Sequence, residues 1–190
     1  MEHRYLKAVL AIAVGLQALF WFGNNLLNWD AANDAVAYAL SQADQEGGYE
    51  RHLIPAINSP FLAKLTLAIV VLGEGIGGSL ALWGATRIWL SRKADADAFT
   101  AAKRFAVLGS GVAVLVWFLL FAVFGGALLQ MGQAPGLRPA LDGAFKFASY
   151  SFLVLIYLSI PEPQRPLNSN VRHIHVGCLC LIKCSASSQV

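Results

Sequence analysis

Four long apolar runs fill most of this 190-residue chain and limit its fold more than any other feature. A helix that crosses the hydrocarbon core of a bilayer needs about 20 consecutive, mostly apolar residues. The pattern therefore predicts an all-α, four-helix transmembrane bundle. The expected spans cover about residues 8–27, 62–88, 105–129 and 143–160.

The connections between the runs predict one membrane domain, residues 1–163, followed by a cytoplasmic tail, residues 164–190. Ser59-Pro60 is typical of a capped helix start. Asp95 and Asp97 precede the third run and indicate a short helix that enters the span from solution. Residues 130–142, rich in glycine and proline, are predicted to form a loop. Residues 31–40 are predicted to form either a short helix on the outer membrane surface or a solvated linker.

Composition agrees with a membrane protein and excludes several other classes. Charged residues make up 13% of the chain, against about 25% in soluble domains. No basic face alternates with aromatic residues, so the sequence does not indicate binding to nucleic acid. It contains no phosphate-binding loop, nucleophile elbow or paired carboxylates. We therefore expect a protein that is not an enzyme.

The basic residues predict the orientation in the membrane. Ten of the 14 lysines and arginines lie in the two tails and the middle loop. Because cytoplasmic segments of membrane proteins carry the excess of lysine and arginine, both termini are predicted to be cytoplasmic. The expected location is a bacterial inner membrane, with the lipid bilayer as the first partner.

The histidines and cysteines give no indication of a cofactor. None of the four histidines lies in a predicted span, so haem ligated by histidines within the bilayer is not expected. Three cysteines and two histidines lie near the C-terminus, but their spacing matches no standard zinc site. An unstructured tail is favoured there over a metal site or palmitoylation. The residues in question are His173, His175, Cys178, Cys180 and Cys184.

The apolar runs carry almost no charged residues away from their ends, and Glu74 is the exception. It lies near the middle of the second predicted span. A carboxylate at the bilayer centre costs about 2.5–3.5 kcal/mol, so the side chain is expected to face protein or water, uncharged or hydrogen-bonded. One interpretation is a proton-relay or ligand-binding carboxyl. The other is a hydrogen bond that locks the bundle, with Gln17, Ser110 or an indole N–H as its partner.

Small residues recur along the same helix every four positions. Such stripes let two helix backbones approach closely. The stripe is either a docking face for another subunit or an internal packing surface that meets a matching patch on the third span. The stripe comprises Gly73, Gly77, Ala81 and Ala85, and the patch comprises Gly109 and Ala113.

A polar cluster lies at the outer end of the first span. Side chains of this kind cap a helix end and bind lipid headgroups, and a ligand site is the less favoured alternative. The cluster consists of Asn24, Asn25, Trp29 and Asp30.

Several short segments in order resemble a bacterial family of predicted small integral membrane proteins of unknown function, over about residues 4–162. The resemblance implies four spans and gives almost no information about activity. One departure is that the paired glycines Gly125-Gly126 are followed here by 127–129, Ala-Leu-Leu, instead of an acid and aromatics. The matching segments are Arg4-Tyr5-Leu6-Lys7, Gly23-Asn24, Trp29-Asp30, Ser59-Pro60, Glu74, Phe99 to Lys103, Trp117-Phe118, Gly125-Gly126, Ala144-Phe145 with Phe147, and Leu155 to Ile160.

Two functions remain open from the sequence. The first is a non-catalytic accessory or assembly subunit that packs against a larger inner-membrane complex, with a bioenergetic complex as one case. The second is a small transporter or permease-like protein that uses Glu74. The first needs a free helix face for other membrane subunits, and the second needs a cavity that reaches this carboxyl.

Overall fold

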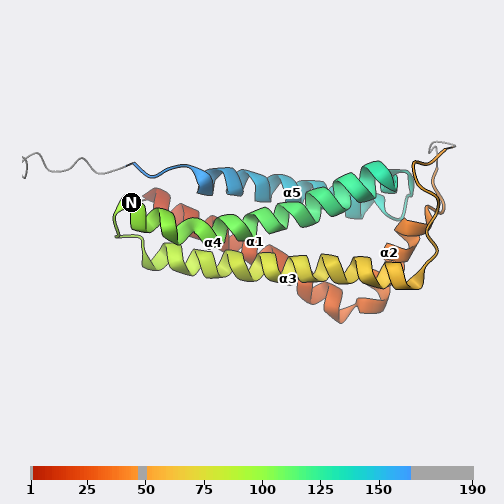
Figure 1. Cartoon of the computed structure of the whole chain (residues 1–190), viewed down its shortest axis with the longest axis horizontal. Helices are drawn as coiled ribbons and strands as arrows, with labels where there is room; N and C mark the ends of the chain where they lie inside the picture. The colour runs from red at the N-terminus through yellow and green to blue at the C-terminus, as the bar shows by residue number, and fades with distance from the viewer. Residues whose placement is uncertain (1, 47–50, 164–190) are drawn as a thin grey trace, which may run out of the picture.

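The computed structural model describes residues 2–46 and 51–163, and the regular elements of this part of the chain are helices. The long helices run side by side along one axis (Figure 1). In chain order the elements are α1 (Glu2–Leu27), α2 (Trp29–Ser41), α3 (Pro60–Leu90), α4 (Ala96–Val114), the π-helix η1 (Leu115–Leu128), the 3₁₀ turn η2 (Met131–Gln133) and α5 (Arg138–Ser159).

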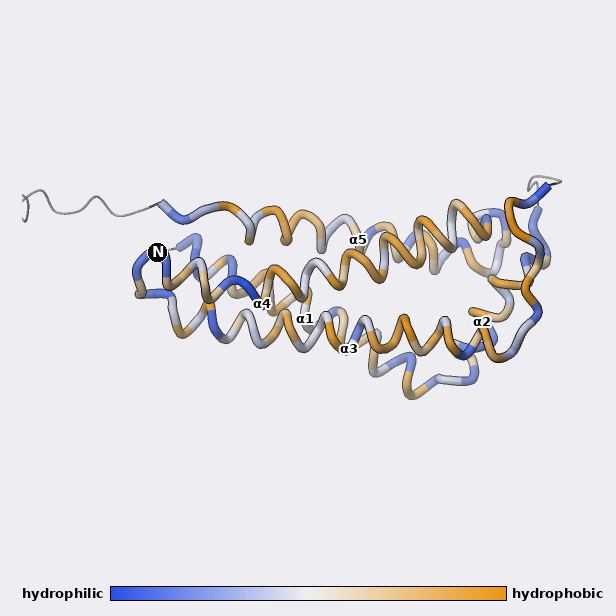
Figure 2. The backbone as a smooth tube through the Cα atoms, viewed as in Figure 1, coloured by the Kyte–Doolittle hydropathy of each residue, from blue (hydrophilic) through white to orange (hydrophobic). Residues whose placement is uncertain are grey.

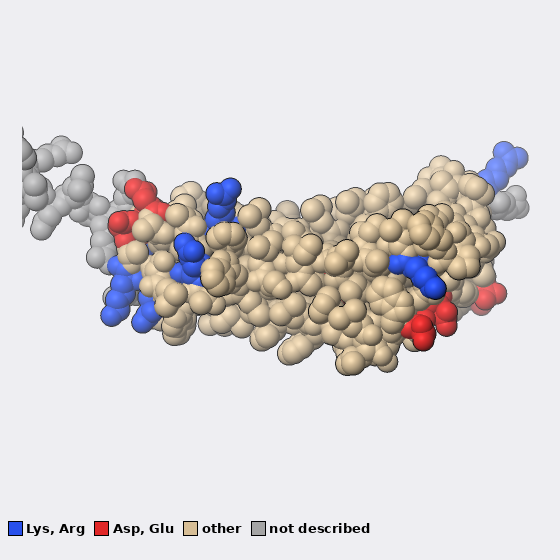
Figure 3. Space-filling view, turned by 60° about the horizontal axis from the view of Figure 1, so that its bottom comes forward, with Lys and Arg blue, Asp and Glu red and all other residues tan. Residues whose placement is uncertain are grey.

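Four of these helical segments are long and apolar enough to cross a bilayer, which confirms the predicted all-α bundle. They are α1, α3, the continuous segment Ala96–Leu128 made of α4 and η1, and α5. Apolar residues dominate the middle of the long helices, and hydrophilic residues gather toward their ends (Figure 2). On the face shown in Figure 3, charged side chains lie near both ends and the long central region carries none. Lipid therefore contacts the uncharged middle of the bundle.

The capped start of α3 lies where the sequence predicts it, but the helices are longer than expected. The Ser59 hydroxyl accepts a hydrogen bond from the Leu62 amide at 3.4 Å, and Pro60 opens α3. The Asp95 carboxylate accepts one from the Ala98 amide at 2.7 Å. This cap starts α4 at Ala96, so the short helix predicted to enter the third span forms the first turns of that span.

The predicted loop over residues 130–142 is wrong in its last part. Helix α5 begins at Arg138, five residues before the predicted start of the fourth span. Pro139 lies in the first turn of α5. There a proline has no intrahelical hydrogen bond to lose and its fixed φ suits the helix.

Residues 31–40 belong to α2. Of the two alternatives for this segment, the helix is confirmed and the solvated linker is not. The helix packs against the bundle instead of lying free on a surface. Leu40 is buried with Ala63 of α3 and Leu129, and its carbonyl accepts a hydrogen bond from the Ile57 amide at 2.9 Å. Helix α2 thereby covers the part of α3 that α1 does not reach.

The bundle has two distinct ends. The terminal end holds the start of α1, the α3–α4 turn and the end of α5, and the loop end holds α2 and η2 (Figure 1). The Lys7 ammonium donates to the Ile160 carbonyl at 3.2 Å, so both ends of the described domain meet on the same side. That this side is cytoplasmic stays a prediction.

The small-residue stripe of α3 is used inside the bundle. A Cβ atom added to Gly109 of α4 would lie 2.7 Å from the Gly77 carbonyl oxygen. Cβ atoms in proteins do not come this close to a neighbouring atom. A Cβ atom on Gly78 would lie 3.0 Å from the Gly15 carbonyl oxygen of α1. Because Ala81 and Ala85 are also buried, the stripe is not a free docking face for another subunit. It lets α3 pack closely against two neighbours at once.

Candidate functional site

The Glu74 side chain lies in the interior of the bundle, with 2% of the residue exposed. The Asn25 amide nitrogen, on α1, donates a hydrogen bond to the Glu74 Oε2 atom at 2.9 Å. The prediction of a hydrogen-bonded, inward-facing carboxyl is confirmed. The predicted partners, Gln17, Ser110 or an indole N–H, are wrong. The buried Gln17 Nε2 and Ser110 Oγ atoms make no hydrogen bond among the described residues, and the hydrogen bond found for Glu74 comes from Asn25.

The close crossing of α1 and α3 explains why these two residues meet. The helices are antiparallel and touch at Gly15 and Gly78. About two turns further along α1, and one turn back along α3, the Phe22 ring lies against Gly75. Continuing both helices by less than another turn brings Asn25 opposite Glu74. Residues 49 positions apart in the chain therefore form one site.

The predicted polar cluster at the end of α1 separates into two parts. Asn25 turns inward, whereas Asn24 and Asp30 are exposed and Trp29 is half-buried. The Asn24 carbonyl accepts hydrogen bonds from the Asn28 amide at 3.0 Å and from the Asn28 side chain at 2.9 Å. These bonds join α1 to α2, so the outer part of the cluster shapes the junction between the helices.

Glu74 and Asn25 lie on the wall of a cavity of about 370 Å³. Ligand pockets in proteins have volumes of about 300–1,000 Å³ and are mostly apolar with a few placed polar groups. Residues from α1, α2, α3, η1 and α5 line this cavity. Apart from two indole rings, polar side chains reach it from Asn25, Thr66 and Glu74. The described lining includes one ionisable side chain, that of Glu74.

Aromatic rings form one wall of the cavity. The Phe147 ring of α5 lies between two indoles, with its centroid 5.7 Å from that of Trp21 and 5.7 Å from that of Trp117. All three residues line the cavity together with Glu74. The tilted ring pairs are of the kind that stabilise a packed aromatic cluster.

The third span widens where it meets the cavity. Over Leu115–Leu128 the helix is a π-helix, and at its end the Leu129 amide donates to the Phe124 carbonyl, five residues back, at 2.9 Å. Its residues Trp117 and Phe121 line the cavity. Such segments are rare and occur frequently at functional sites, because they move side chains out of the regular α-helical positions.

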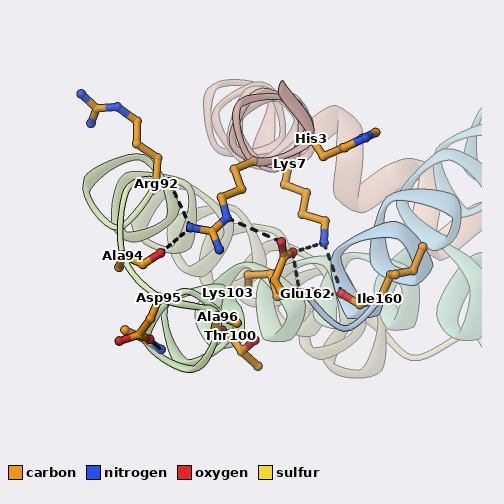
Figure 4. A network of polar contacts seen from close by, with 12 residues as sticks. His3, Lys7, Arg92, Ala94, Asp95, Ala96, Thr100, Lys103, Ile160 and Glu162 are labelled. Carbon is orange, nitrogen blue, oxygen red and sulfur yellow. Dashed lines mark hydrogen bonds and ion pairs between the residues drawn. The ribbon is translucent and has the colours of Figure 1, made fainter. Parts of the chain in front are cut away.

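A second buried carboxyl, that of Glu162, lies at the terminal end and has entirely different surroundings (Figure 4). Its Oε1 atom contacts the Lys7 ammonium and lies 3.5 Å from the Lys103 ammonium. Its Oε2 atom lies 3.6 Å from Arg4 Nε. The Ile160 carbonyl accepts hydrogen bonds from both lysines. This network joins α1, α4 and the segment after α5.

The charges around Glu162 set its protonation. Burial alone disfavours the ionised carboxylate, but the hydrogen bond and charge of Lys7 and the charge of Lys103 outweigh it and hold the pKa of Glu162 below its ordinary value. Sequence reasoning missed this group, because it counted the two lysines only as orientation signals. The signal available was an acid placed directly after the last span, on the side of the bundle where basic residues gather.

No group of three or more histidine, cysteine, aspartate or glutamate side chains in residues 2–46 and 51–163 is placed to hold a metal ion. The histidines and cysteines of the tail lie outside the described residues. The expectation of no cofactor stays a prediction.

Comparison with known proteins places the chain in a family. Neither curated proteins nor solved structures give a match. A protein-family profile matches residues 3–161, a stretch that contains Asn25, Glu74 and the four spans except for the first residue of α1. This match covers most of the chain and agrees with the resemblance seen in the sequence. The chain belongs to the family described as "Predicted small integral membrane protein (DUF2165)".

Proposed function

We propose that this protein binds a small, largely apolar molecule inside the membrane and recognises the polar group of that molecule with Glu74. The observation that carries the proposal is the cavity of about 370 Å³ that Glu74 lines. A bacterial inner membrane is the proposed location, and the proposal assigns no catalytic step to the chain.

The hydrogen bonding of Glu74 supports recognition over a purely structural role. An ionised carboxylate has about four acceptor positions, and a buried polar group that lacks partners costs about 1–3 kcal/mol. Among the described residues, Asn25 supplies the one hydrogen bond found for this carboxyl. The Oε1 atom therefore remains free for a group on a ligand.

The cavity favours the second of the two functions that the sequence left open. That function needed a cavity reaching Glu74, and such a cavity is present. The small-residue stripe, which was the docking face expected for an accessory subunit, is used within the bundle, where Gly77 and Gly109 pack against each other. Binding is the part of a transporter-like role that the geometry supports, and movement of the ligand across the bilayer stays a prediction.

Native mass spectrometry tests the proposal, because it detects small molecules that remain bound after the detergent is removed. The test compares the wild-type protein with Gly143→Leu. Gly143 lines the cavity, and a Cβ atom there would meet only Phe147 Cε2, at 3.9 Å. A side chain can therefore begin at this position without a clash at its Cβ atom, and we expect a leucine to fill part of the cavity.

Gly111→Leu is the matched control. Gly111 lies on α4 away from the cavity, and a Cβ atom there meets nothing within 4 Å. We expect a bound small molecule in the wild type and in Gly111→Leu, and its loss in Gly143→Leu. Equal occupancy in all three proteins, or none in any after reconstitution with a membrane extract, would refute the proposal.

A further inference from the structure

We propose that the molecule recognised in this cavity is a lipophilic organic cation, an amine or quaternary ammonium compound with an apolar body. The inference rests on the proposed function and specifies the substrate class of the same site. It follows from the charge of the cavity, from its aromatic wall and from the position of its opening.

The charge of the cavity favours a cation over an anion or a neutral molecule. Glu74 is the one ionisable side chain among the described residues that line it, and no lysine or arginine lies on this wall. A bound cation would balance the carboxylate, and in a medium of low dielectric constant such a pair interacts strongly. A bound anion would face like charge on the ionised carboxylate, and a neutral alcohol would supply no charge to stabilise the ionised form.

The aromatic wall provides a second attraction for positive charge. A cation within about 6 Å of a tryptophan, tyrosine or phenylalanine ring is attracted to the negative face of that ring. Trp21, Phe147 and Trp117 form a continuous series of rings on the wall that Glu74 shares. Several aromatic rings around one site are the feature by which proteins recognise quaternary ammonium groups.

The opening of the cavity indicates that the ligand arrives from the lipid. The exposed lining residues lie on the flank between α1 and α2 on one side and α5 on the other. They are Trp21, Ala35, Pro139 and Ala140. The Ala35, Pro139 and Ala140 side chains are small and apolar, and the Trp21 ring is apolar apart from its indole N–H. A molecule that partitions into the bilayer reaches such an opening directly.

Three probes of similar size separate the ligand classes. Phenylbutylammonium, phenylbutanol and phenylbutyrate share a phenyl ring on a short alkyl chain and differ in a cationic, neutral or anionic end. Their affinities are measured by isothermal titration calorimetry on the full chain in phosphatidylcholine nanodiscs, with empty nanodiscs as the blank. The phosphatidylcholine bilayer carries no net charge, so it does not itself select the cation.

We expect the ammonium probe to bind more tightly than the alcohol and the carboxylate. Glu74→Gln should weaken the ammonium probe by about tenfold or more, because a close charge pair is lost. The same change should affect the alcohol by less than about threefold, because the glutamine keeps hydrogen-bonding groups in place. Glu74→Asp keeps the charge and should keep the order of the three probes, which separates loss of charge from damage to the fold.

A second pair of variants tests the aromatic wall. Trp21→Leu should weaken the ammonium probe by about threefold or more and leave the alcohol nearly unchanged. Trp89→Leu is the control, because Trp89 packs against Tyr5 at the terminal end, away from the cavity.

The outcomes distinguish this inference from the proposed function. An alcohol that binds at least as tightly as the amine, with Glu74 still required, overturns the cation and leaves the proposed binding function intact. Ammonium binding that Glu74→Gln does not weaken also overturns the inference. Failure of all three probes, together with no molecule lost from Gly143→Leu in the mass spectra, overturns both.

Discussion

The carboxyls of Glu162 and Glu74 are both buried, but they have opposite surroundings. Glu162 lies among Arg4, Lys7 and Lys103 at the terminal end (Figure 4). Glu74 has one amide partner and faces an apolar cavity. Three cationic side chains surround the Glu162 carboxylate, whereas the Glu74 carboxyl has no cation beside it among the described residues. This contrast separates a group that holds helices together from a group that remains available to a ligand.

The difference follows from where each acid lies along its helix. Glu162 comes after α5 ends, where the long side chains of Lys7 and Lys103 reach it from α1 and α4. Glu74 lies in the middle of α3, where the neighbouring helices present apolar and small residues. An ionisable group in such a place is costly. Its position beside a cavity is the reason to assign it a function.

The largest effect on stability is expected at the terminal end. Glu162→Gln removes the one carboxylate that three cations share and leaves their charges buried together. Breaking a buried ion pair from one side costs about 3–5 kcal/mol, so we expect a loss of about 3 kcal/mol in the free energy of unfolding. Titration with sodium dodecyl sulfate in mixed micelles measures it.

The exposed Glu2, on the same end of the bundle, provides the control. Glu2→Gln should change the free energy of unfolding by less than about 0.5 kcal/mol. If Glu162→Gln is equally mild, the network is a surface feature and the contrast between the two acids fails.

Acid should weaken the same network. The folded-state pKa of Glu162 lies below its ordinary value of 4.5, so its stabilising contribution is complete above that pH and is lost as the pH falls through the folded-state pKa. The slope is at most about 1.4 kcal/mol per pH unit for one group. Thermal melting between neutral pH and strongly acidic pH should show a steeper loss in the wild type than in Glu162→Gln. Parallel curves would assign the acid sensitivity to other carboxyls.

A smaller effect on stability is expected at Glu74. Glu74→Leu removes one hydrogen bond and leaves Asn25 without its partner, which costs about 1 kcal/mol. Glu74→Gln should cost less, because an amide still pairs with Asn25. Both values come from the same titration as for Glu162. A loss of 3 kcal/mol or more in Glu74→Leu would make this residue a structural lock like Glu162.

Sequence patterns predict the four spans and the inward orientation of Glu74, because both depend on local composition and on the cost of charge in lipid. They do not predict the pair Asn25–Glu74. That pair depends on how α1 rotates about its axis and on where it crosses α3, and several polar residues near the bilayer centre were equally good partners. The stripe of small residues indicated a close crossing, either with another subunit or with the patch at Gly109 and Ala113. The structure shows the contact with that patch, and a second contact with α1 that the sequence did not indicate.

The sequence does not predict the cavity or the Glu162 network either. The cavity lies beyond the end of α1, where α3 continues and α2 covers the rest of α3. The π-helix η1, which is wider than an α-helix, lies beside it. Each of these is a boundary that depends on tertiary packing. The network joins Lys7, Lys103 and Glu162, which are far apart in the chain and share no motif.

The central claim is that the Glu74 carboxyl is reached through the cavity from the lipid and that the Glu162 carboxyl is not. Dicyclohexylcarbodiimide tests it directly, because this apolar reagent adds to a carboxyl to give a stable N-acylurea that peptide mass spectrometry locates. We predict modification at Glu74, its loss in Gly143→Leu, its retention in Gly111→Leu, and none at Glu162. Modification of Glu162 in preference to Glu74, or labelling of Glu74 that Gly143→Leu does not reduce, would contradict the account.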